Sequence, residues 1–158
     1  MVITYHPSSR QGNIGYMLRQ YSEIKMPAEY EKKVESCRFT LCSNCAGTTL
    51  YLLGVIDTDR EISTYLVYAD YLSKMQRLDA PVPGCIIAFN VRGPYGIETK
   101  HMGVVTATFP YLLMTHRDGT NGRLIEDQPL KRMRGRHAAV WLGHIKAEYY
   151  MPNTPNLK

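Results

Sequence analysis

The sequence predicts an α+β domain in which helices pack on a mostly antiparallel sheet of about five strands. Two observations carry this prediction. Apolar residues recur at helical spacing in the first half of the chain, and short β-prone runs separated by turn signals fill the second half. The change falls at 79–84, where two prolines and a glycine end the helical half. Helices followed by a run of strands are typical of the α+β class.

The N-terminal segment 1–40 is expected to be helical after an irregular arm. A short strand is expected over 2–5 and a helix over 16–24. Pro27 suits the first turn of a second helix, in which Tyr30 and Val34 lie four residues apart and share a face.

Two further helices are expected before the boundary at 79–84. The segment 45–56 carries apolar residues at helical spacing, and either Ser43 or Asn44 can cap its first turn. A longer helix is expected over about 60–78, with Ile62, Leu66 and Ala69 on one face.

The second half of the chain is expected to form strands. Turn signals such as Gly93-Pro94, Asp118-Gly119 and Asn121-Gly122 separate the β-prone runs. The predicted strands cover 85–91, 101–108, 111–116, 123–126 and 138–145. The tail 152–158 contains prolines and asparagines and is expected to be frayed.

Length and composition limit the class of protein. The 158 residues provide one domain, 1–158, and 44% hydrophobic with 21% charged residues is an ordinary globular balance. No apolar run is long enough to span a membrane, and the N-terminus lacks a classical secretion signal. We expect a protein that is cytoplasmic as made, with any export by a non-classical route. The net charge of +5 permits an anionic partner without identifying one.

Cys45 is the best candidate for a reactive side chain. It stands at a predicted helix start, where free amides and the helix dipole favour a thiolate. A thiolate nucleophile needs a group that moves protons, and imidazole is the usual one. His101 begins one predicted strand and His116 ends the next. We expect the two imidazoles to lie side by side at one end of the sheet, close to Cys45.

This order of residues resembles the NlpC-type cell-wall peptidases, which are small papain-like cysteine enzymes. Where that family has Asp-Cys-Ser-Gly, Pro-Gly-Asp, a His-Val-Gly-Ile strand and a strand ending in histidine, the chain has similar segments. They are Asn44-Cys45-Ala46-Gly47, Pro83-Gly84-Cys85, His101-Met102-Gly103-Val104 and Leu112-Leu-Met-Thr-His116. The resemblance covers about 44–127, and 1–40 diverge from the family.

The resemblance implies a papain-like fold and a role for each matched residue. Cys45 would be the nucleophile, with its own backbone amide in the oxyanion site, and His101 the general base. His116 would orient His101, although Asp118 or Asn121 is also chemically adequate for this task. The family places a tyrosine shortly before its nucleophile. No tyrosine lies between Tyr30 and Cys45, so the second oxyanion donor stays open.

A different class of protein is the main alternative. Cys37, Cys42 and Cys45 have the C-x4-C-x2-C spacing of plant-type [2Fe–2S] ferredoxins, with Cys85 as a fourth ligand. The basic net charge, the long gap before Cys85 and the bulky residues 39–41 argue against a cluster. In the enzyme interpretation no cofactor or metal is needed, and Cys37, Cys42 and Cys85 are small core residues.

We therefore expect a cysteine hydrolase that cleaves an amide or isopeptide bond. The resemblance implies a peptide or peptidoglycan stem-peptide substrate. A protein inhibitor or immunity protein is a further candidate partner. A secreted effector that deamidates or cleaves a host protein is an alternative use of the same core, and an idle binding domain is a third class. The basic run 131–137 is interpreted as a solvated loop, so no nucleic-acid partner is expected.

Overall fold

The computed structural model describes residues 26–131 and 145–153. Within this part, six strands form one antiparallel sheet with the order β1-β6-β2-β3-β4-β5. The strands are β1 (Gln76–Leu78), β2 (Ile86–Gly93), β3 (Gly96–Ala107), β4 (Leu113–Arg117), β5 (Leu124–Pro129) and β6 (Ala147–Met151). The helices are α2 (Tyr30–Cys37), α3 (Cys45–Leu52), α4 (Val67–Asp70) and the 3₁₀ turn η1 (Leu72–Lys74). The α+β prediction is confirmed.

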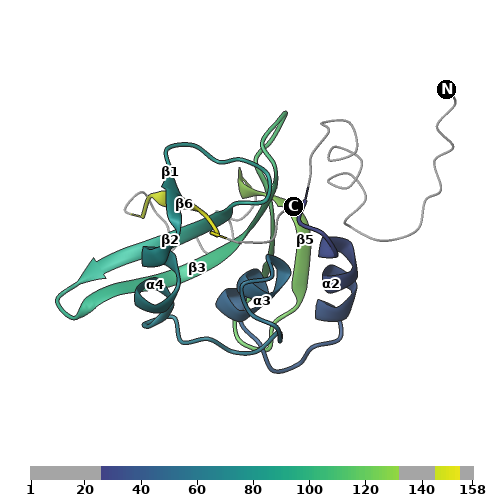
Figure 1. Cartoon of the computed structure of the whole chain (residues 1–158), viewed down its shortest axis with the longest axis horizontal. Helices are drawn as coiled ribbons and strands as arrows, with labels where there is room; N and C mark the ends of the chain where they lie inside the picture. Colours follow the sequence, from purple (N-terminus) through teal and green to yellow (C-terminus); the bar gives the residue numbers. More distant parts are fainter. Residues whose placement is uncertain (1–25, 132–144, 154–158) are drawn as a thin grey trace, which may run out of the picture.

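The helices lie on one side of the sheet (Figure 1). Helix α3 packs against β3 and β4, α4 packs against β3, and α2 packs against α3. In α2, Tyr30 and Val34 are both buried, as their spacing predicts. Helix α3 ends four residues before the predicted limit of 56, because Gly54 has a φ of 72° and turns the chain in the left-handed conformation.

The predicted helix over 60–78 is wrong. Ile62, Val67 and Leu72 are the buried residues of this stretch, and their spacing of five does not fit one helical face. Leu66, which was expected on the buried face, is 55% exposed. The carbonyl of Thr64 accepts the backbone N–H of Thr99 on β3, so this stretch is tied to the sheet. It forms α4, η1 and β1 in place of one helix.

Four of the five predicted strands correspond to β2, β3, β4 and β5, with shifts at their ends. Strand β3 begins earlier than expected, because the β2–β3 ladder continues to the hairpin pair Gly93 and Gly96. Strand β6 was not predicted. The predicted strand over 138–145 lies outside the described residues except for Ile145, which is not in a strand. The elements expected over 2–5 and 16–24, and most of the basic run and of the tail, also lie outside them.

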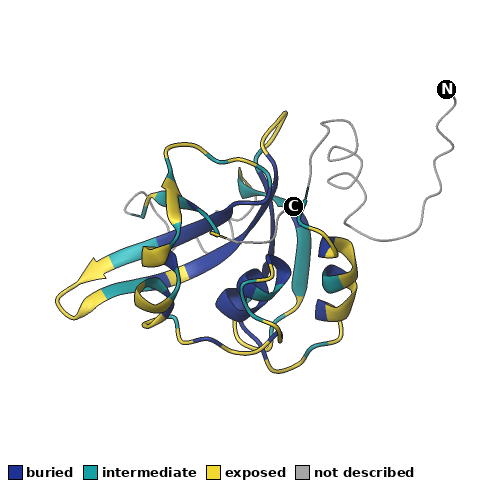
Figure 2. Ribbon diagram, in the orientation of Figure 1, coloured by how far each residue is buried: buried dark blue, intermediate teal, exposed yellow. Residues whose placement is uncertain are grey.

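The sheet carries an apolar core on each face. The helix-side core joins α2, α3 and α4 to β2, β3 and β6 through Ile86, Ala88, Met102, Val104 and Tyr150. The opposite core contains Cys85, Ile87, Phe89, Val105 and Met114. This alternation follows the two-residue period of a strand. Figure 2 shows the buried band across α3 and the middle of β2 and β3, with an exposed hairpin tip. No helix of the described part is long and apolar enough to cross a bilayer.

Candidate active site

Cys45 is the first residue of α3, and Asn44 caps the helix. Asn44 has an extended backbone and its Oδ1 accepts the N–H of Gly47 at 2.9 Å, which confirms one of the two predicted caps. The same Oδ1 accepts the N–H of Ile62 at 3.3 Å, while Nδ2 donates to the Ile62 carbonyl at 2.7 Å. The cap therefore also joins α3 to the 59–62 loop. An ionised aspartate, the residue of the resembled family here, could not make the bond to that carbonyl.

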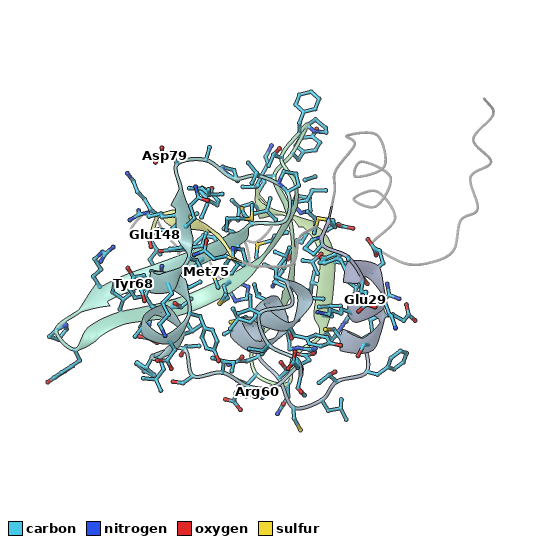
Figure 3. All side chains as sticks on the ribbon, in the orientation of Figure 1. Glu29, Arg60, Tyr68, Met75, Asp79 and Glu148 are labelled. Atoms are coloured by element: carbon cyan, nitrogen blue, oxygen red, sulfur yellow. The ribbon has the colours of Figure 1, made fainter. Side chains whose placement is uncertain are left out.

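The 59–62 loop also passes very close to the first turn of α3. A Cβ on Gly47 would lie 1.6 Å from the carbonyl oxygen of Arg60. Figure 3 labels Arg60 in this loop, close to α3. Glycine is thus required at position 47 by the approach of another backbone segment, and the match to the family's Cys-x-Gly pattern has a packing reason.

The sulfur of Cys45 is enclosed. The residue is 5% exposed, and burial raises the pKa of its thiol. Backbone N–H groups of Met102, Ala46 and Cys45 hydrogen-bond the sulfur and lower this pKa, but by less than burial raises it. The backbone amides favour the thiolate, as expected for a helix start, but burial outweighs them and the net shift of the Cys45 pKa is upward. The resting group is a thiol that needs a base to remove its proton.

His101 on β3 and His116 on β4 form a hydrogen-bonded pair. The His101 Nε2 and the His116 Nδ1 lie 2.9 Å apart, and the rings meet edge to face at an interplanar angle of 86°. Both residues are buried, at 4% and 1% exposure. The predicted juxtaposition of the two imidazoles is present. The hydrogen bond from Met102 to Cys45 places the sulfur at the β3 backbone one residue from His101.

Gly103 makes the approach of the two histidines possible. A Cβ at this position would lie 2.8 Å from the carbonyl oxygen of Thr115 and 3.0 Å from the Cβ of His116. It would also lie 2.3 Å from the terminal methyl group of the buried Met114 side chain. Any side chain at position 103 would therefore push β4 away from β3 at the point where His116 meets His101.

Gln128 on β5 extends the polar contacts, and sequence analysis missed it. Its Oε1 lies 2.5 Å from the His116 Nε2. A β-bulge precedes it: Met114 pairs with Gln128 but His116 pairs with Ile125, and Asp127 has a φ of 50°. No sequence motif singles out Gln128, because its contact depends on the register of β5 against β4.

Arg117 and Asp59 form a buried ion pair on the other side of β4. The Arg117 Nη2 lies 2.8 Å from the Asp59 Oδ2, and the two side chains are 2% and 3% exposed. Hydroxyl groups of Ser43 and Thr48 donate to the Asp59 Oδ1, and Thr48 also accepts the Arg117 Nε–H at 2.7 Å. We call these four residues the arginine network. It joins β4 to the loop before Cys45 and to the first turn of α3.

The remaining donors of Arg117 fix backbone segments. Its guanidinium donates to the carbonyl oxygens of Cys37, Thr40 and Gly122 at 2.9, 3.3 and 2.9 Å. The segment that leads into Cys45 is thus held by charge-assisted hydrogen bonds. Within this segment, Thr40 lies between Phe39 and Leu41, two apolar residues that are each 77% exposed.

Three residues were predicted as alternatives to orient His101. Among them, His116 makes the hydrogen bond to His101 described above. Asp118 and Asn121 lie in the turn between β4 and β5. There the backbone N–H of Asp118 donates to the Arg123 carbonyl at 3.0 Å, and that of Asn121 to the Ser43 carbonyl at 2.8 Å. Asn121 is exposed and has a φ of 55°, so its role is to turn the chain.

The four cysteines occupy different surroundings. Cys37 and Cys45 belong to the helix-side core, Cys85 belongs to the opposite core, and Cys42 is exposed. Among the described residues no group of three or more His, Cys, Asp or Glu side chains is arranged to hold a metal ion. Cys37 and Cys85 are buried as predicted, whereas Cys42 was wrongly expected in the core.

The arrangement can support nucleophilic chemistry by a thiol. A helix N-terminus supplies amides, an enclosed thiol supplies a nucleophile, and an imidazole pair supplies a route for the proton. Comparisons with known proteins add no relative: no family model, curated protein or solved structure matches the chain.

Proposed function

We propose that the protein is a cysteine hydrolase that cleaves an amide or isopeptide bond. The observation that carries the proposal is the buried His101–His116 hydrogen bond next to the strand position at which a backbone amide binds the Cys45 sulfur. A buried pair of imidazoles is uncommon in an ordinary core, since histidine is expensive to bury without partners. The hydrogen bond from the Met102 backbone brings the enclosed Cys45 thiol to the strand that carries His101, and this common strand is what supports a chemical use for each group.

In the proposed reaction, His101 takes the thiol proton as the Cys45 sulfur attacks the carbonyl carbon. The backbone N–H of Cys45 would stabilise the negative charge on the carbonyl oxygen. His101 would then return the proton to the leaving amine, which departs and leaves a thioester on Cys45. A water molecule deprotonated by His101 would hydrolyse the thioester and restore the thiol. His116 would orient His101 and share its positive charge during these steps.

Peptidoglycan stem peptides are the substrate class we propose first, on the strength of the resemblance over 44–127. The same chemistry would act on a glutamine side chain or a peptide bond of a protein. Protein deamidation or cleavage is therefore one outcome of the test.

The activity test compares the parent protein with Cys45→Ala on purified peptidoglycan, with mass analysis of the soluble products. We expect peptide fragments from the parent and none from the variant. No products from either protein would reject peptidoglycan and direct the search to protein and small amide substrates. Products from both proteins in equal amounts would reject Cys45 as the nucleophile.

A thiol-labelling test examines the site without a substrate. It uses a Cys42→Ser background, because the exposed Cys42 would itself react with the label. We expect a small alkylating reagent to label Cys45, and the rate to fall about tenfold or more in His101→Ala. Lys100→Ala is the matched control, since Lys100 is an exposed neighbour on β3. An unchanged rate in His101→Ala would reject the proposed base.

A further inference from the structure

Three side chains on three neighbouring strands form one continuous line of hydrogen bonds. His101 lies on β3, His116 on β4 and Gln128 on β5, and the two contacts measure 2.9 and 2.5 Å. Both nitrogens of His116 are used, Nδ1 toward His101 and Nε2 toward Gln128. The direction of the donors along this line can therefore be worked out from the chemistry of its last member.

The Gln128 end of the line fixes the position of each proton. With the Gln128 oxygen assigned toward His116, the His116 Nε2 carries a hydrogen, because an amide oxygen only accepts hydrogen bonds. A neutral His116 then has a lone pair on Nδ1, and the His101 Nε2 must donate to it. A neutral His101 in turn has its lone pair on Nδ1. That is the nitrogen a general base would use to accept the proton of Cys45.

We infer that Gln128 is a positioning residue that holds both imidazoles in the Nε2–H tautomer and so prepares the His101 Nδ1 to act as the base. The inference rests on the proposed function for its consequence in catalysis, but the tautomers are properties of the folded protein. Gln128 acts only through His116 and is not placed at the reacting atoms.

The uncharged amide of Gln128 is as important as its oxygen. A carboxylate at this position would favour a proton on both nitrogens of His116. A doubly protonated His116 would donate through Nδ1, so the His101 Nε2 would have to accept, and the hydrogen of His101 would move to Nδ1. The lone pair required by the proposed base would then be lost. Glutamine provides an acceptor without this charge.

The test measures the tautomers directly by long-range proton–nitrogen NMR of the imidazole rings in the full-length protein. We expect Nε2–H for both His101 and His116 in the parent. Gln128→Leu should give His116 a mixture of tautomers, and Gln128→Glu should produce a doubly protonated His116 near neutral pH. Gln76→Leu is the matched control, because Gln76 is exposed on the edge strand β1. An Nδ1–H tautomer of His116 in the parent, or unchanged tautomers in Gln128→Leu, would overturn the inference.

The kinetic arm separates this inference from the proposed function. If the parent hydrolyses its substrate, kcat of Gln128→Leu and Gln128→Glu should fall on the order of 10- to 100-fold with little change in KM. Unchanged kcat in both variants would overturn the inference while the proposed function stands. If no substrate is hydrolysed but the NMR results are as expected, the proposed function fails and the assignment of Gln128 stands.

Discussion

His116 and Arg117 are consecutive residues of β4 that serve opposite faces of the sheet. His116 bonds His101 at 2.9 Å, whereas Arg117 bonds Asp59 at 2.8 Å and Thr48 at 2.7 Å beside the first turn of α3. Because successive side chains of a strand point to opposite faces, one short strand connects the imidazole pair to the helix that carries Cys45. A shift of β4 would move both together.

Replacing Arg117 by methionine should destabilise the fold strongly. The variant keeps most of the side-chain volume but leaves the Asp59 carboxylate buried without its cation, and breaking such a pair typically costs about 3–5 kcal/mol. Urea unfolding followed by circular dichroism measures the loss. Arg92→Met is the control, because Arg92 is 63% exposed and lies 3.6 Å from Glu148, and it should change stability by less than about 1 kcal/mol. Equal effects of the two substitutions would contradict the role given to Arg117.

The ion pair should also make stability depend on pH. Burial raises the pKa of Asp59, but hydrogen bonds from neighbouring hydroxyl and thiol groups and the charge of Arg117 outweigh it, so the net shift is downward. The pKa of Asp59 is therefore lower in the folded state than in the unfolded chain. Its contribution is fully present above about pH 4 and is lost as the pH falls through the folded-state value. Unfolding free energies measured from pH 7 to pH 3 should show this loss.

The variant Asp59→Asn should show a weaker dependence of stability on pH over that acid range, although it starts from a lower stability at neutral pH. Asp57→Asn, which changes an exposed carboxyl two residues away, should keep the dependence of the parent. The interpretation fails if Asp59→Asn and the parent lose stability in parallel.

Alanine at Gly103 should disrupt the histidine pair more than it disrupts the fold. The added Cβ meets the Thr115 carbonyl oxygen at 2.8 Å and the Cβ of His116 at 3.0 Å, and overpacking of this kind costs about 1–3 kcal/mol. We expect slower labelling of Cys45 and altered imidazole signals in a protein that still folds. Gly93→Ala is the control, since its Cβ would have no neighbour closer than 3.8 Å. Parent-like imidazole signals in Gly103→Ala would show that β4 does not need this close approach.

The substitution Asn44→Asp should lower the stability of the protein, although the resembled family has aspartate at this position. The Asn44 Nδ2 donates to the buried Ile62 carbonyl at 2.7 Å, and a carboxylate would bring negative charge against that oxygen. We expect Asn44→Asp to lose about 1–3 kcal/mol of stability, measured by denaturant unfolding. Asn153→Asp removes a comparable bond, to the Lys74 carbonyl at 2.9 Å, at an exposed site and should be nearly neutral. A stabilised Asn44→Asp would show that the helix start favours the charge over the loop contact.

The sequence was informative where a residue's role is set by its immediate neighbours. The helix start at Cys45, its Asn44 cap and the strands that carry His101 and His116 follow from local patterns and turn signals. The 60–78 stretch was mispredicted because exposed apolar residues such as Leu66 completed a helical pattern that the fold does not use. Tertiary contacts, including the bond from Thr99 to Thr64, override that local preference.

The residues around the histidines and the thiol could not be predicted from local sequence patterns. Gln128 meets His116 through the pairing of β5 with β4, across a separation of 12 positions, and Arg117 meets Asp59 across a separation of 58 positions. Such relationships depend on strand register and on how a helix is seated on the sheet. The net upward shift of the Cys45 pKa was not predicted, for a related reason. A helix start, which lowers the pKa, can be recognised from sequence, whereas the burial that raises it cannot.

The arginine network also limits how the site could be transplanted. A graft that carried only Cys45, His101 and His116 into a new scaffold would leave behind the guanidinium that holds the loop before Cys45. The smallest transferable unit therefore includes the buried ion pair and the two hydroxyl groups that serve it. A designer who wanted this arrangement elsewhere would have to reproduce a folded junction of helix, loop and strand as well as three side chains.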